Sequence, residues 1–158
     1  MKALFAASAT IGGALAFAGA ALAEPVADGG RKFTTPMSGA EECNSPGTCA
    51  VGDPDGSATG SITVNVGQDR VCWEFTNVTN VAPVNRGHIH KAPAGSNGGI
   101  VVDFFNVAAG MQGPLTGCTT TPLGRELLLD IIRDPSAYYL NLHNADFPAG
   151  AVRGQLEK

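Results

Sequence analysis

Short runs of alternating apolar and polar residues, separated by Gly, Pro, Asn and Asp, extend along most of this chain. Residues 62–66 (ITVNV) and 71–76 (VCWEFT) alternate with a period of two, and the short segment between them has turn composition. The pair therefore predicts a β-hairpin, in which Val71, Trp73 and Phe75 face the core. Repetition of such runs is typical of an all-β protein.

The remaining pattern predicts further strands and one helix. Residues 99–105 are more continuously apolar, which predicts a strand buried on both faces or beside a covering helix. Residues 121–133 carry an apolar stripe of helical period, with Thr121 expected as N-cap and Pro122 at the first helical position. Additional strands are predicted over residues 31–38, 86–91, 138–143 and 151–156.

Together these elements predict the fold class. We expect a Greek-key-like β-sandwich or flattened barrel of about seven or eight strands with one connecting helix. No linker or internal repeat divides residues 31–156, so they are expected to form a single domain.

The first residues have the composition of a secretory signal peptide. Lys2 precedes a small, apolar stretch, and the Ala-Leu-Ala sequence at 21–23 is a cleavage motif. Cleavage after Ala23 would leave residues 24–30 as a disordered lead-in. The sequence therefore predicts a secreted or periplasmic protein with no membrane span in its mature part. The net charge of −4 and the lack of a basic run argue against nucleic acid as a partner.

All four cysteines follow the predicted signal peptide, and export to an oxidising compartment favours disulfides. Three pairings are possible. Cys43–Cys49 would close a short, turn-rich loop, which leaves Cys72–Cys118 as a long-range bond. A four-cysteine zinc site is less favoured, because the spacing lacks paired C-x2-C knuckles.

All three histidines lie in two of the predicted strands. His88 and His90 are two residues apart and therefore project from the same face, as do Tyr139, Asn141 and His143. If the two strands are neighbours, the three imidazoles converge.

Two hypotheses follow from this convergence. The leading one is a non-catalytic binding or structural module, for an unidentified protein or surface partner, that is organised by a buried polar network. That network would comprise His88, His90, Asn141, His143, Asn144 and Arg153. The alternative is a mononuclear copper or zinc site of the three histidines, with possible redox activity. No other cofactor is indicated.

The sequence argues weakly for catalysis without a metal. It has no G-x-S-x-G nucleophile motif, and four disulfide-bonded cysteines leave no thiol nucleophile. Glu41 and Glu42 are interpreted as a solvated acidic turn. An enzymatic activity is therefore not the favoured interpretation.

Three long motifs resemble the chordin-type (CHRD) domain. They are FTTPMSGAEE at 33–42, GHIH with PAGSNGGIVV at 87–102, and YYLNLHNADFPAGAVRGQL at 138–156. The resemblance implies a β-rich extracellular module and little about activity. Secreted bacterial members carry a cysteine before an aromatic residue on an early strand and another before the helix. Cys72 and Cys118 match these positions, which implies that they pair.

The H-x-H strand also resembles the copper-binding strand of the copper–zinc superoxide dismutases, which contains G-F-H-V-H. The two-metal site of that family needs more histidines than the three present here. A bimetallic centre is therefore excluded, and only a simpler centre remains.

Overall fold

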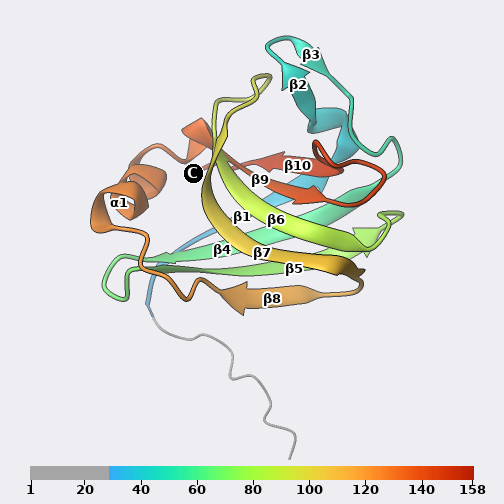
Figure 1. Cartoon of the computed structure of the whole chain (residues 1–158). Coiled ribbons are helices and arrows are strands. Elements are labelled where there is room, and N and C mark those ends of the chain that lie inside the picture. Colours follow the sequence, from blue (N-terminus) through green and yellow to red (C-terminus); the bar gives the residue numbers. More distant parts are fainter. Residues whose placement is uncertain (1–28) are drawn as a thin grey trace, which may run out of the picture.

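An eight-stranded antiparallel sheet forms the body of the protein in the computed structural model, which describes residues 29–158 (Figure 1). The strand order is β7-β6-β9-β10-β1-β4-β5-β8. The edge strands β7 and β8 are consecutive in sequence and contact each other, so the curled sheet nearly closes into a barrel. The all-β prediction is confirmed, and a flattened barrel with one helix describes residues 29–158 best. The predicted signal peptide lies outside the described residues.

The sheet strands differ in length, from four to thirteen residues. A separate two-stranded hairpin, β2–β3, lies above the sheet in Figure 1. The strands are β1 Arg31–Ser38, β2 Cys43–Ser45, β3 Thr48–Cys49, β4 Ser57–Asn65, β5 Arg70–Thr79, β6 Val84–Lys91, β7 Gly99–Met111, β8 Leu115–Cys118, β9 Tyr138–His143 and β10 Val152–Gln155. The helix is α1 Arg125–Arg133, and short 3-10 turns cover Gly39–Glu41 and Pro135–Ala137.

The predicted hairpin corresponds to β4 and β5, and its apolar face lines the core. Val71, Trp73 and Phe75 are buried as predicted. Trp73 stacks on Phe104 of β7 with ring centroids 4.8 Å apart, so aromatic contact joins strands from the two halves of the sheet. Burial of these large rings against one another stabilises the barrel near the gap between its edge strands, β7 and β8.

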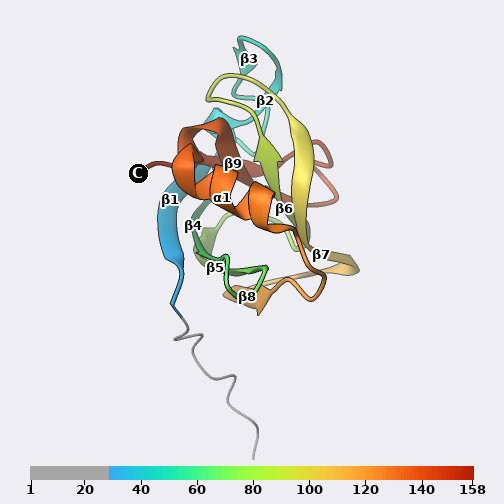
Figure 2. The same ribbon diagram turned by 90° about the vertical axis from the view of Figure 1, so that its left-hand side faces the viewer.

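The helix begins later than the sequence pattern indicated. Gly124 immediately precedes the helix and has φ = 88°. A positive φ is incompatible with a right-handed α-helix, so the helix cannot extend to residues before Arg125. Thr121 and Pro122 therefore lie in the connection rather than in the first turn, and that expectation was wrong. Leu128 and Ile131 are nonetheless fully buried, so the apolar stripe faces the core as expected. Figure 2 shows α1 lying across one end of the curled sheet.

Strand β7 differs from its prediction in both length and burial. It runs thirteen residues, and only alternate side chains such as Val102 and Phe104 are buried, whereas Asp103 is exposed. The expectation of burial on both faces was wrong, because the side chains that face outward from β7, such as Asp103, are exposed to solvent. No helix formed by residues 29–158 is long and apolar enough to span a membrane.

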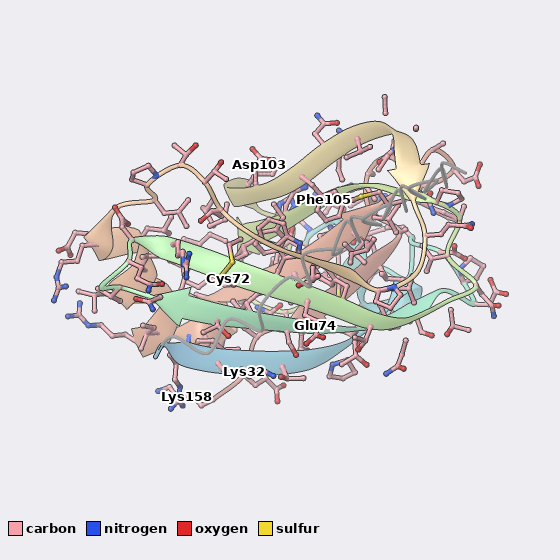
Figure 3. The ribbon with its side chains drawn as sticks, turned by 90° about the horizontal axis from the view of Figure 1, so that it is seen from below. Lys32, Cys72, Glu74, Asp103, Phe105 and Lys158 are labelled. Carbon is pink, nitrogen blue, oxygen red and sulfur yellow. A yellow bond between two sulfur atoms is a disulfide. The ribbon has the colours of Figure 1, made fainter. Side chains whose placement is uncertain are left out.

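Two disulfides fasten the periphery of the fold. Cys43–Cys49 joins β2 to β3, and Cys72–Cys118 joins β5 to the edge strand β8 at directly opposed positions. Figure 3 shows the bond at Cys72 beside β5. No free cysteine occurs in the described part of the chain.

Candidate metal centre

A buried layer of polar side chains lies on the outer face of β6 and β9. Ile89 and Leu142 enter the core, and strand alternation therefore turns His88, His90 and His143 to the opposite face. The two strands are neighbours, with Arg86 of β6 paired to His143 of β9. The sequence left the adjacency of the two histidine-bearing strands as a condition, and the structure meets that condition.

Loops cover this outer face, so the histidines are buried although they lie outside the barrel. His88, His90 and His143 are only 2%, 7% and 5% exposed. The loop of residues 92–98 rises beside the β2–β3 hairpin, and the amide of Gly47 donates to the carbonyl of Gly95 at 3.1 Å (Figures 1 and 2). Residues 144–150 form a second cover over the end of β9.

The three imidazoles converge closely enough to share an ion. One ring nitrogen from each of His88, His90 and His143 lies within 4.8 Å of the others. The ring centroids are 4.8 to 6.0 Å apart. Nitrogens bound to one ion at about 2.0–2.1 Å lie about 3.3 Å apart in a tetrahedral site, so the rings would need to shift inward to hold it.

Two of the rings have their orientation fixed by backbone carbonyls. His90 Nδ1 lies 2.9 Å from the oxygen of Gly98, and His143 Nδ1 lies 3.1 Å from the oxygen of Pro148. A carbonyl oxygen can only accept, so each Nδ1 carries the proton. In the neutral rings, Nε2 of both histidines consequently presents a lone pair to the shared centre.

His88 has the reverse orientation. Its Nε2 lies 3.0 Å from a carboxylate oxygen of Asp103, whose side chain is 75% exposed on β7 (Figure 3). Its Nδ1 lies 3.0 Å from His143 Nε2. Both neighbours are acceptors, so a neutral His88 has one proton for two contacts. A carboxylate that holds the outer N–H of a histidine is the usual support for a metal-binding imidazole.

His90 provides the clearest sign of an incomplete interaction. Its Nε2 is buried and has no hydrogen-bond partner among residues 29–158. The His90 ring stacks on Tyr139, with centroids 4.8 Å apart and planes 8° apart, so it cannot turn to find another partner. The Tyr139 ring is in turn covered by the guanidinium of Arg153 at 3.5 Å.

Burial keeps these histidines neutral. It lowers the pKa of His88 to about 4, although Asp103 opposes the shift, and it lowers the pKa of His143 to about 4 together with the positive charges nearby. The pKa of His90 is lowered by the same cause. Neutral imidazole is the form that binds metals, so no proton needs to be displaced near neutral pH.

The other predicted network residues lie on the same face but contact the histidines less directly. Arg153 is buried and donates to the carbonyls of Ser96 at 2.7 Å and Pro93 at 3.0 Å, which anchors the covering loop. Asn144 accepts a bond from the Phe147 amide at 2.7 Å and so shapes the second cover. The histidines bond instead to two carbonyls, to Asp103 and, through His88 and His143, to each other.

Glu42 is a buried acid that sequence reasoning placed in solvent. It is 1% exposed, so the solvated-turn interpretation was wrong for Glu42, although Glu41 is exposed. Burial raises the pKa of Glu42 to about 6, opposed by Arg153 and by a hydrogen bond from Asn141. The carboxyl group fits only because Gly150 lacks a side chain, since a Cβ there would lie 2.4 Å from it. No local pattern in the sequence signals this burial.

We expect the metal-free protein to lose stability as the pH falls from 6.5 to about 4. The two histidines bind protons near pH 6.5 when unfolded and only near pH 4 when folded, so the unfolded state holds more protons in this window. Glu42 acts in the opposite direction between pH 6 and 4.5, because its folded pKa is raised. The free energy of unfolding is expected to fall by about 2 kcal/mol in total, allowing for screening by solvent.

Urea denaturation at pH 7 and pH 4.5 measures this difference. A His88→Gln/His143→Gln variant should show a smaller dependence on pH, since the lowered pKa of His90 and the raised pKa of Glu42 then remain and act in opposite directions. A stability that is unchanged or higher at pH 4.5 in the unaltered protein would show that these rings are not held neutral by folding.

In the comparison with known families, the family model described as CHRD domain matches residues 33–156. No curated protein and no solved structure matches the chain.

Proposed function

The chain belongs to the CHRD domain family, and we propose that its histidines His88, His90 and His143 bind one divalent transition-metal ion, Cu²⁺ or Zn²⁺. The observation that carries this proposal is that the two nitrogens of each ring make different contacts. One nitrogen of every ring is held by an oxygen acceptor, and the other points into the shared centre.

A metal ion explains contacts that a purely structural network leaves unsatisfied. In the network hypothesis, His90 Nε2 stays buried without a partner, and neutral His88 lacks a proton for one of its two acceptors. Each such unmet group costs on the order of 1–3 kcal/mol. An ion at the centre accepts all three lone pairs, while His88 keeps its proton for Asp103. The geometry therefore favours the metal site over the network.

The donor set favours copper or zinc over hard cations. Three imidazoles and no carboxylate in the inner set suit Cu²⁺ and Zn²⁺, and the usual order of affinities places Cu²⁺ first. Three protein ligands leave at least one coordination position open, as in metal sites that accept an exogenous ligand.

We also infer that the protein is exported by cleavage after Ala23, in a bacterial cell, and that it acts in the periplasm or outside the cell. The signal-like N-terminus and the two disulfides support this inference. In such a compartment the domain would hold its metal as a binding module.

The direct test is the metal content of untagged protein purified from its native secretory route. Elemental mass spectrometry is expected to find close to one copper or zinc ion per chain, and the intact mass to show loss of residues 1–23. Metal-free protein that also fails to take up added Cu²⁺ or Zn²⁺ would refute the proposal and restore the structural network as the better account. Metal that persists after removal of all three histidines would also refute it.

A further inference from the structure

Arg86 lies on β6 two residues before His88, and it does not have a carboxylate partner within residues 29–158. Strand alternation places Arg86, His88 and His90 on one face, and Arg86 is paired in register with His143. It donates one long bond of 3.5 Å to the carbonyl of Pro148, the same oxygen that accepts from His143 Nδ1. The guanidinium is partly exposed, so most of its five donors remain available.

The charges around the site leave a bound metal ion uncompensated. All three ligands are neutral imidazoles, so the ion keeps both of its positive charges. Two arginines act on the site electrostatically: Arg86 on His88 and His143, and Arg153 on His90. Two carboxylates, Asp103 and Glu42, offset only the arginines. A buried dication without a counter-charge is unfavourable.

Building on the proposed metal site, we propose that its open coordination position binds a small anion and that Arg86 is the residue that selects for negative charge there. Arg86 supplies a fixed positive charge beside two of the three ligands and N–H donors that a carboxylate or inorganic anion accepts. Asp103 accepts the hydrogen bond from His88 Nε2 on the far side of that ring, so its carboxylate does not fill the open position. The ligand class is a compact monoanion, either inorganic or a carboxylate.

The test uses the full secreted chain loaded with one equivalent of Cu²⁺ and titrated with sodium azide. Azide binding to copper is followed by its charge-transfer absorption and by the change in the electron paramagnetic resonance spectrum. The unaltered protein is expected to bind azide, and Arg86→Gln to weaken that binding about tenfold, a typical effect of losing one charge-assisted contact. Cu²⁺ affinity itself should not fall, because Arg86 is not a ligand and its positive charge opposes that of the ion.

Matched variants separate charge selection from structural damage. Arg133→Gln removes an equal charge from the exposed end of α1 and should leave azide binding unchanged. Arg86→Lys keeps the charge and should retain most of the affinity. Imidazole, a neutral ligand for the same position, should bind Arg86→Gln and the unaltered protein equally well.

The outcomes distinguish this inference from the metal proposal. Protein that binds Cu²⁺ but not azide, or that binds azide equally well with Gln at position 86, overturns the role of Arg86 and leaves the metal site intact. Protein that binds no metal overturns both. Acetate that displaces azide at comparable concentration assigns the position to carboxylates, whereas failure to displace it restricts the site to small inorganic anions.

Discussion

Replacing His143 by alanine is expected to lower the affinity of the protein for Cu²⁺ by more than about 100-fold, beyond the roughly 10- to 100-fold typical of residues outside the inner ligand set. The change removes one of three ligands and leaves two nitrogens that cannot fix the ion's position. It also removes the partner of His88 Nδ1 and leaves the carbonyl of Pro148 with only the long bond from Arg86. Competition with a chelator of known affinity measures the loss.

The control lies on the same strand. Tyr138→Phe changes a buried residue of β9 on the opposite face and should preserve Cu²⁺ affinity. If His143→Ala binds Cu²⁺ as tightly as the unaltered protein, the three-histidine site does not exist. The metal-free variant should also lose about 1–3 kcal/mol of unfolding free energy, because buried partners are left unsatisfied.

Removing the Cys72–Cys118 disulfide by a double change to alanine is expected to cost about 4 kcal/mol of unfolding free energy. The bond spans 46 residues, so it restricts the unfolded chain strongly. It also fixes β8, a four-residue edge strand whose partner in the sheet is β5. Urea denaturation under non-reducing conditions measures the difference.

The second disulfide provides the comparison. Cys43–Cys49 spans only six residues, and its double change to alanine is expected to cost about 2 kcal/mol. Equal losses for the two variants would contradict the argument from loop length. A loss below about 1 kcal/mol at Cys72 and Cys118 would show that β8 is held by its other contacts.

The sequence by itself determined the features that depend on neighbours along the chain. Period-two alternation located the β4–β5 hairpin and its core face at Val71, Trp73 and Phe75. The same alternation required His88 and His90 to share a face, because no backbone conformation of an ordinary strand separates residues two apart. Sequence therefore identified which side chains could converge.

Only the tertiary structure decided how those side chains are held. Whether β6 and β9 pair is a matter of strand order, which no local pattern encodes. The acceptors that fix the imidazole protons come from Gly98, Pro148 and Asp103, on covering loops and on an edge strand. Glu42 is buried by contacts with Gly150 and Asn141, more than ninety residues away. Local propensity governs which elements form. Burial of the histidines and the positions of their ring protons depend instead on long-range packing, and both are needed for the three histidines to form a binding site.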